Sequence, residues 1–403
     1  MWVFAAALLL FQTPDFSAEG AKLLDEGKYE AAAQSFQKAI EADPRNYYAH
    51  FNLALADGLL HKDADGIAEY RKTLELKPHL YEAELNGGIL LMRQKEPASA
   101  LPLFEDAAAQ KPQEFQPRYF LAEAQLETGD AAQAAANFQQ AAGLNPKSAA
   151  AEMGIAHALV RQGKLDDAAS HYRRAAQLDP AFRPSLLELA DLYEKNHQDA
   201  EAAAIYREFP ENAAAQERAG ALMLEGKRYA DAIPSLEAAY AKEPNESNRV
   251  ALAQAYLFAG KRQQALPLLQ QAAAAEPSSF DVRMAYARAL RDGRQYAPAA
   301  GQFAAAVQLK PADAAAWRDL GDMLYLTGDL ARALVAFEKA RQLGEDTPGN
   351  AFLRAIILDK QKQLKPALEA YRQFLSMSQG KNPDQEWQAR QRVKLLEREV
   401  ERR

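Results

Sequence analysis

Proline recurs in this chain at a nearly fixed interval, and this interval is the strongest constraint on how the chain can fold. The prolines stand at Pro44, Pro78, Pro112, Pro146, Pro180, Pro244, Pro277 and Pro311, the first five of them 34 residues apart. A fixed period of about 20–50 residues is typical of repeat architectures, in which each period is one small supersecondary structure. Neighbouring repeats stack and bury a continuous core. The chain is therefore predicted to be an array of similar repeats.

Other residue types recur in the same frame. With Pro44 taken as position 32 of its repeat, eleven repeats can be aligned over the sequence. Position 8 is small in most of them, as in Ala54 and Gly88, and position 20 is small throughout, as in Ala100 and Ala134. Position 24 is aromatic or leucine, at Phe36, Tyr70, Phe104, Phe138, Tyr172, Tyr206, Leu236, Leu269, Phe303, Phe337 and Tyr371.

Each repeat is predicted to form two helices, here called helix A and helix B. Apolar residues at positions 4, 7, 8 and 11 share one face of helix A, and positions 20, 24 and 27 share one face of helix B. The small residues at positions 8 and 20 should let the two backbones approach closely, with the side chain at position 24 filling the space beside them. Helix A is expected to end at a glycine, because the residue after a helix often needs a positive φ. These glycines are Gly27, Gly129, Gly163, Gly226, Gly260, Gly293 and Gly328.

These columns resemble the tetratricopeptide repeat family over residues 13–379. The resemblance implies an all-α fold, a right-handed superhelical solenoid of about eleven helix-turn-helix repeats. Residues 380–403 are predicted to form a charged C-terminal capping helix, since solenoids need a polar cap for solubility. In this helix Trp387, Val393, Leu395 and Leu396 are expected to cover the end of the last repeat.

Two repeats depart from the pattern. The repeat that begins at Arg183 is four residues short, and its helix B should stop at Phe209-Pro210. This short repeat is predicted to be the weakest point of the solenoid, because stability in repeat arrays depends on nearest-neighbour interfaces. The eleventh repeat carries Arg354 at position 7, which is normally apolar. Either the charge of Arg354 is paired, or this repeat is loosely docked.

The first twelve residues are predicted to be a signal peptide. The run from Trp2 to Phe11 is apolar and ten residues long, which is too short to span a bilayer but suits the apolar core of a secretory signal. However, no Lys or Arg precedes the run, and no Ala-x-Ala cleavage site follows it. The alternative is an apolar extension that packs on the first repeat. We expect an exported, periplasmic protein if the segment is removed and a cytoplasmic one if it is not, with membrane association only through this segment.

Composition and motifs argue against several chemical functions. The formal net charge of −7 disfavours nucleic-acid binding, which needs clustered Lys and Arg. The chain has no Cys, and no two of its six histidines stand at i and i+4, so no metal site is expected. There is no phosphate-binding loop and no G-x-S-x-G nucleophile motif. Because the repeats leave no segment long enough for a catalytic domain, we expect no enzyme, no catalytic residue and no cofactor.

The resemblance also implies where partners bind. In the family, helix A lines the concave surface, so positions 2, 5, 6, 9 and 12 should face a groove that holds protein or peptide partners. The partner-binding residues predicted in this way are Tyr48, Phe51, Asn52, Asn86, Tyr119, Phe120, Glu123 and His157. Their aromatic rings would form pockets, and their amides would bond a peptide backbone. The alternative is that they pack between neighbouring A helices.

A second, more polar patch is predicted on the A helices of the C-terminal half, at Arg288, Arg291, Arg318 and Asp322. Together these features predict a non-enzymatic protein–protein interaction scaffold or adaptor, in the bacterial cell envelope if the export signal is real. The alternative is a non-catalytic subunit that supports a separate enzyme, for example in glycan or polysaccharide synthesis. Co-purification separates the two, because a subunit should bring down one stoichiometric enzyme.

Overall fold

Helices make up almost all of residues 15–401, the part of the chain that the computed structural model describes. This part contains 23 α-helices and one short 3-10 turn, η1 (Pro180–Phe182), and it contains no strand. The expectation of an all-α fold is confirmed. Within these residues, no helix combines the length and the apolar content that crossing a membrane requires. The predicted signal segment, residues 1–12, lies outside the described residues.

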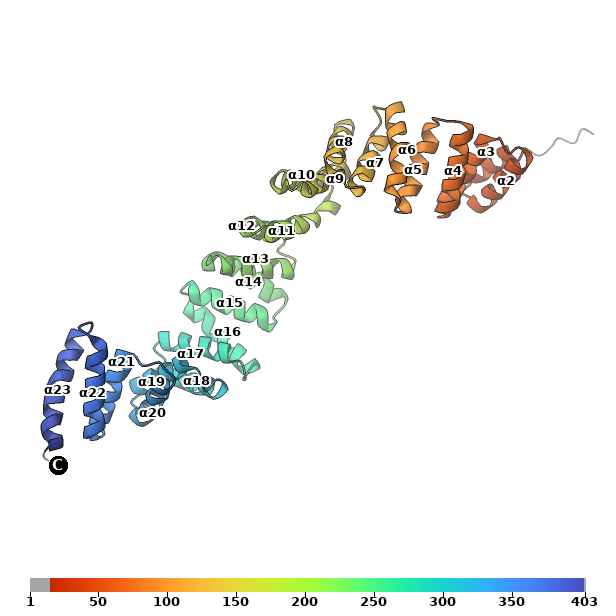
Figure 1. The fold of residues 1–403 in the computed structure, drawn as a ribbon. Coiled ribbons are helices and arrows are strands. Elements are labelled where there is room, and N and C mark those ends of the chain that lie inside the picture. The colour runs from red at the N-terminus through yellow and green to blue at the C-terminus, as the bar shows by residue number, and fades with distance from the viewer. Residues whose placement is uncertain (1–14, 402–403) are drawn as a thin grey trace, which may run out of the picture. The chain divides into compact units, whose positions relative to one another are not determined.

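The helices alternate between the two types that the repeat frame predicts (Figure 1). The A helices are α1 (Phe16–Asp25), α3 (Tyr47–Leu59), α5 (Tyr81–Arg93), α7 (Phe115–Glu127), α9 (Ala149–Arg161), α11 (Ser185–Lys195), α13 (Ala213–Glu225), α15 (Glu246–Phe258), α17 (Phe280–Asp292), α19 (Ala314–Leu326) and α21 (Pro348–Lys360). The B helices are α2 (Tyr29–Ala42), α4 (Asp63–Leu76), α6 (Pro97–Gln110), α8 (Ala131–Leu144), α10 (Leu165–Leu178), α12 (Asp199–Tyr206), α14 (Tyr229–Lys242), α16 (Arg262–Ala275), α18 (Tyr296–Leu309), α20 (Leu330–Gln342) and α22 (Leu364–Ser378). The final helix is α23 (Pro383–Glu401).

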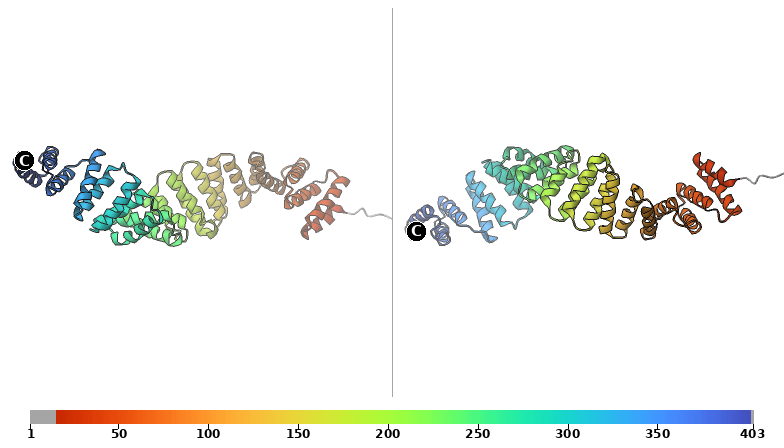
Figure 2. Two further views of the ribbon diagram at one scale, coloured as in Figure 1. Left: turned by 90° about the horizontal axis from the view of Figure 1, so that it is seen from below. Right: turned by 90° about the horizontal axis from the view of Figure 1, so that it is seen from above.

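The chain divides into two compact units, here called the first unit, up to Asn196, and the second unit, from His197 onward. Within each unit, successive helices lie side by side, as the further views also show (Figure 2). The division falls inside the short repeat that the sequence singles out, between its helices α11 and α12 rather than after helix B. Helix α12 has 8 residues, whereas the B helices α10 and α14 have 14 each.

The predicted close approach of the two helices of a repeat is confirmed. At position 8 of the third repeat, a Cβ built on Gly88 would lie 2.5 Å from the ring of Phe104 at position 24. In the tenth repeat, a Cβ on Gly321 would lie 2.6 Å from the ring of Phe337. Phe104 is fully buried, as is Ala100 at position 20. The ring at position 24 therefore lies directly against the backbone of helix A.

The turns between helices A and B follow the expectation in part. Gly27 and Gly129 take positive φ of 72° and 94°. Gly226 and Gly293 end α13 and α17 as predicted, but neither takes a positive φ, so only this part of the prediction is wrong for them. Lys227, which follows Gly226, takes the left-handed conformation at φ 57°. The left-handed residue of these turns stands at position 15 of the repeat, as Gly27, Gly129 and Lys227 do, whereas Gly226 and Gly293 stand at position 14.

Arg354 is paired, which decides between the two alternatives for the eleventh repeat. Its side chain is 1% exposed, and its guanidinium donates to both carboxylate oxygens of Asp346, with both bonds at 3.1 Å. Gln373 on α22 accepts a further bond from Arg354 at 2.9 Å. A buried guanidinium needs this many acceptors because desolvating it is costly. This network ties α21 to α22 and to the loop before α21.

The capping helix is only partly as predicted. Leu396 and Ala389 are fully buried against α22, and Val393 packs beside them. Trp387 is 65% exposed and Leu395 is exposed as well, so the expectation that these two side chains cover the last repeat is wrong. The reason is helical geometry: residues 389, 393 and 396 share one face of α23, whereas residues 387 and 395 lie on another.

A matched pair of alanines on α8 tests the repeat frame. Ala134 at position 20 is fully buried, whereas Ala136 is exposed. Ala134→Leu should lower the free energy of unfolding by about 1–3 kcal/mol, because extra methylenes strain a dense interior. Ala136→Leu should change it little, as measured by urea denaturation. Equal effects at the two sites would contradict the assigned frame.

The Arg354 network makes a second prediction about stability. Asp346→Asn removes the carboxylate that accepts two hydrogen bonds from the buried guanidinium, leaving Glu338 at 3.5 Å as its remaining charged partner, and should cost roughly 3 kcal/mol. The control is Glu75→Gln, which removes an ion pair whose Lys72 and Glu75 side chains are 46% and 65% exposed, and it should cost roughly 0–1 kcal/mol. Chemical denaturation of both variants measures the difference. An Asp346→Asn variant as stable as the control would show that the network contributes nothing.

Candidate partner-binding groove

The surface formed by the A helices, here called the A-helix face, carries the predicted partner-binding residues. On α3, Tyr48 is 46% exposed and is the most accessible of them. The ring of Phe51 packs edge-on against Tyr70, with ring centroids 5.7 Å apart. Asn52 is buried, and its Nδ2 donates to the backbone oxygen of Tyr48 at 2.8 Å. Only Tyr48 of these three keeps its side chain free toward solvent.

The second predicted amide is also engaged within the fold. Asn86 on α5 is half-buried, and its side chain hydrogen-bonds the hydroxyl of the buried Tyr70. The side-chain amides of Asn52 and Asn86 therefore already form hydrogen bonds within the protein. Little of their hydrogen-bonding capacity remains for the backbone of a bound peptide.

The aromatic residues of α7 pack on one another and on the adjacent B helices. Tyr119 stacks on Phe115 at 5.3 Å and contacts Phe138 edge-on at 5.6 Å. Phe120 stacks on Phe104 at 5.7 Å. The Tyr119 hydroxyl donates to Oε1 of Glu123 at 2.7 Å. Burial raises the pKa of the Glu123 carboxyl above its ordinary value, although this hydrogen bond acts in the opposite direction.

His157 on α9 lies at the edge of this row. Its ring contacts Tyr172 edge-on at 5.8 Å, and its Nε2 lies 3.7 Å from Oε1 of Glu188. The Tyr172 hydroxyl donates to the same carboxylate oxygen at 3.0 Å. The structure thus brings the predicted residues together along successive A helices, but most of their rings and amides serve packing within the repeats. Their role in partner binding stays a prediction.

In the second unit, the predicted polar patch converges on a carboxylate that the sequence analysis missed. Asp319 is buried on α19, with its carboxylate 3.7 Å from Arg288, 3.6 Å from Arg291 and 2.9 Å from Arg318. Asp322 lies beside this cluster, and burial, together with the charge of Asp319, raises its pKa to about 6. The repeat frame could have identified Asp319 as a candidate site residue. It stands at position 6, where earlier repeats carry the predicted partner-binding residues Asn52 and Asn86.

Two hollows of the A-helix face flank Arg291. One, of about 510 Å³, lies among α15, α17 and α19, and its apolar wall includes Phe258, Phe280 and Met284. The other, of about 460 Å³, is lined by Asp322, Met323, Tyr325, Leu326 and Leu353. Arg291 lines both hollows. Apolar hollows with a few polar groups are the usual shape of a binding site.

Both hollows expose a large apolar side chain at the same repeat position. Phe258 is 63% exposed and Leu326 is 53% exposed, and both stand at position 13 of helix A. Most other repeats carry a charged residue there, for example Arg93 and Glu127. Phe258 is held in place by stacking on Tyr229 at 4.7 Å. An apolar residue at a repeat position that is usually charged could therefore have indicated these hollows from the sequence.

A group of metal-ligand types also occurs in the first unit, where the sequence predicted none. Ligand atoms of His79, Glu84 and Asp106 lie within 4.8 Å of one another. Glu84 is buried and accepts a hydrogen bond from Gln110, and the His79 Nδ1 atom lies 3.8 Å from both carboxylates. This donor set suits a divalent metal ion. Sequence spacing missed it because its members come from a turn and two different helices.

Comparison with known proteins identifies the repeats. Models of tetratricopeptide repeats match residues 20–57, 91–136, 119–182, 159–225, 250–314 and 287–351. The chain belongs to the tetratricopeptide repeat family. The predicted resemblance is confirmed, and the A-helix face described above is the face on which the resemblance places the partners of tetratricopeptide repeats.

Individual relatives share only part of their length with this tetratricopeptide repeat protein. The Hsp70-Hsp90 organizing protein of Triticum aestivum is 30% identical over 108 residues, which are 27% of this chain and 19% of that protein. DnaJ homolog subfamily C member 3 of Rattus norvegicus is 30% identical over 95 residues, 24% of this chain and 19% of that protein. The chain thus matches about a fifth of each relative.

Solved structures of MamA resemble part of the chain. MamA of Desulfovibrio magneticus RS-1, from residue 41 onward, is 20% identical, covers 41% of this chain and 94% of its own, and has a TM-score of 0.39. A second MamA structure is 19% identical, covers 42% of this chain and 94% of its own, and has the same TM-score of 0.39.

Proposed function

We propose that this chain is a non-enzymatic scaffold that binds an extended segment of a partner protein along the A-helix face of its second unit. The observation that carries the proposal is the pair of hollows on either side of Arg291. Each hollow offers an apolar wall for one bulky side chain of the partner. Arg291 lies between them and Arg288 lines the first hollow, and both can donate to backbone carbonyl groups of the segment.

The energetics of interfaces favour this part of the face. Binding hot spots are enriched in aromatic residues and arginine, in sheltered pockets from which a partner excludes water. Phe258 and Leu326 leave much of their apolar surface exposed, so covering them yields hydrophobic stabilisation. In the first unit, by contrast, Tyr119 and Phe120 are already packed within the repeats.

The relatives support a scaffold rather than a catalyst. One of them carries a name that describes the organisation of two other proteins, Hsp70 and Hsp90. Because the match covers 19% of that relative, it supports the general role of binding proteins and not a choice of partner. Co-purification of one stoichiometric enzyme would favour the alternative of a subunit that supports catalysis on another chain.

Substitutions in the two hollows test the site. Crosslinking in extracts of the native host would first identify a partner, and calorimetry would then give its dissociation constant. Phe258→Ala and Leu326→Ala should each weaken binding by about 2 kcal/mol, because hot-spot side chains lose this much on truncation. Val335→Ala on α20 is the matched control, since Val335 is 65% exposed but lies on a B helix.

The same experiment can place the site elsewhere. If Tyr48→Ala and Tyr119→Ala weaken binding while Phe258→Ala and Leu326→Ala do not, the partner binds the first unit, as the sequence analysis predicts. Circular dichroism of each variant separates lost binding from lost folding. Phe258→Ala needs this check most, because it also removes the stacking on Tyr229.

The proposed setting is outside the cytoplasm, in the periplasm, on the strength of the apolar run from Trp2 to Phe11. Removal of residues 1–12 during export would leave a mature chain that starts close to α1. Mass spectrometry of the N-terminus of the protein from its native host tests this. A soluble cytoplasmic protein that still begins at Met1 would exclude export and favour packing of the segment on the first repeat.

A further inference from the structure

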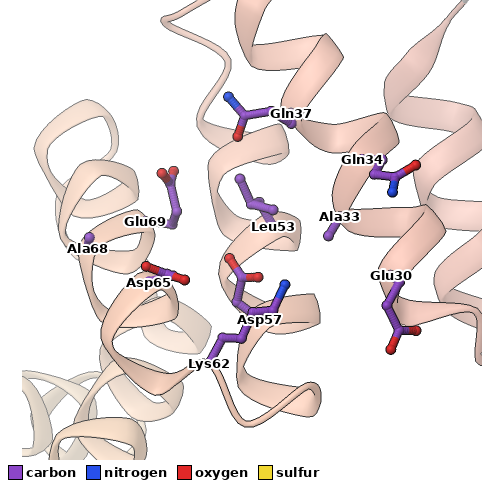
Figure 3. Close-up of a pocket in the computed structure, with 10 residues that line it drawn as sticks. All are labelled: Glu30, Ala33, Gln34, Gln37, Leu53, Asp57, Lys62, Asp65, Ala68 and Glu69. Carbon is purple, nitrogen blue, oxygen red and sulfur yellow. The ribbon is translucent and has the colours of Figure 1, made fainter.

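The opposite surface of the first unit, formed by the B helices, contains a strongly acidic hollow (Figure 3). This acidic pocket has a volume of about 450 Å³ and lies among α2, α3 and α4. Its ionisable lining residues are Glu30, Asp57, Lys62, Asp65 and Glu69. Gln34 and Gln37 add two amides, and Ala33, Leu53 and Ala68 add apolar surface. Leu53 and Asp57 come from the A helix α3, but at positions 7 and 11, and none of the lining residues stands at positions 2, 5, 6, 9 or 12, where the partner-binding residues are predicted.

Asp57 is the unusual member of the acidic pocket. It is 6% exposed, and its carboxylate points into the space between α3 and α4, on the side of Asp65 and Glu69 (Figure 3). Among residues 15–401, no side chain or backbone group forms a hydrogen bond with this carboxylate or pairs with it within 4.0 Å. Burial raises its pKa to about 6, with Lys62 acting against this rise and Asp65 and Glu69 adding to it. The group is therefore charged at neutral pH, and the one cationic neighbour among these residues, Lys62, acts on it without an ion pair within 4.0 Å.

In another repeat, the side chains at the same positions form hydrogen bonds with one another and need no ligand. In the fourth repeat, Gln125 stands at position 11, where Asp57 stands in the second. The Gln125 amide donates to Gln133 at position 19, at 3.2 Å, and accepts from Asn137 at position 23, at 2.8 Å. The second repeat has Asp65 and Glu69 at those two positions. Amides both donate and accept, but three carboxylates can only accept, so they cannot satisfy one another.

The charges around the acidic pocket do not cancel within the chain. From α3, the Nδ1 atom of His50 lies 2.5 Å from the Glu69 carboxylate, while Nε2 faces the backbone oxygen of Pro44 at 3.1 Å. Lys62 is exposed at the start of α4. Even with both of these groups counted as cations, four carboxylates leave an excess of negative charge. Such an excess of negative charge attracts a cation to the pocket.

We propose that the acidic pocket binds an organic cation, an ammonium or guanidinium group carried on an aliphatic stem. Asp57 would receive the charged head at the base of the pocket, with Asp65 and Glu69 beside it, and Leu53, Ala33 and Ala68 would contact the stem. The volume of about 450 Å³ is far larger than a bare metal ion needs, and the group of clustered metal-ligand atoms in the described residues lies elsewhere, at His79.

This chemistry has two sources that experiments can tell apart. One is a lysine or arginine side chain of a protein, and the other is a free polyamine. The acidic pocket and the hollows beside Arg291 share no residue and lie in different units, so either proposal can fail while the other stands.

Calorimetry with the full chain at low ionic strength tests the proposal. The ligands are spermidine and the peptide acetyl-Ala-Arg-Ala-amide, with acetyl-Ala-Gln-Ala-amide as the uncharged control. The wild-type chain should bind at least one cationic ligand and not the control, and added salt should weaken binding because it screens charge. Tighter binding of the arginine peptide assigns the pocket to a protein side chain, and tighter binding of spermidine assigns it to a polyamine.

Two variants locate the binding. Asp57→Asn keeps the shape of the side chain, and Asp57→Leu installs the residue found at position 11 in several other repeats, such as Leu91 and Leu159. Both should weaken cation binding at least tenfold and raise the thermal midpoint of unfolding at pH 7, because they remove a buried charge. Glu41→Gln is the matched control, since it removes an exposed charge from α2 outside the pocket and should leave binding within twofold.

Three results would overturn the proposal. The first is a folded wild-type chain that binds neither cation at millimolar concentration. The second is equal cation binding by wild type and Asp57→Asn, which would place the cation elsewhere on an acidic surface. The third is a lower thermal midpoint for Asp57→Asn than for wild type, which would mean that the carboxylate is already satisfied within the chain.

Discussion

The contact between the side chain at position 24 and the backbone of helix A determines most of this structure. Gly88 and Gly321 leave so little room above Phe104 and Phe337 that an added methyl group would overlap the ring. In these repeats the contact sets how closely helices A and B can approach, and the next repeat then stacks on the surface that the pair presents. The two proposed binding sites use other positions of the repeat, chiefly 6, 9, 11, 12 and 13 of helix A and 19 and 23 of helix B.

The sequence predicted the features that depend on this periodic contact. Helix pairs, small columns and the buried rings of Phe104 and Phe138 follow from spacing alone, because every repeat needs the same packing. Spacing could not predict features that depend on a contact found in only one repeat. Asp319 was missed because the three arginines around it come from two helices, and Trp387 was misplaced because nothing in the sequence fixes how α23 rotates about its axis.

Polar residues at normally apolar positions distinguish one repeat from another. Arg354 at position 7 is matched by Asp346 and Gln373, and Gln125 at position 11 is matched by Gln133 and Asn137. Asp57 at position 11 has no such match. The repeat frame reveals this difference, because a polar side chain at position 11 can be compared between a repeat that supplies hydrogen-bond partners and one that does not. Sequence alone names the residues, but only the structure shows whether the surrounding side chains donate or accept.

The division of the chain inside its short sixth repeat has a thermodynamic consequence. A ligand stabilises the part of a protein whose folded state binds it, and in a repeat array this effect passes mainly between neighbours. An organic cation in the acidic pocket would therefore delay the melting of the first unit, whereas a partner segment beside Arg291 would delay that of the second. Two ligands on one polypeptide would then act with little linkage between them, so the occupancy of one site would not report the occupancy of the other.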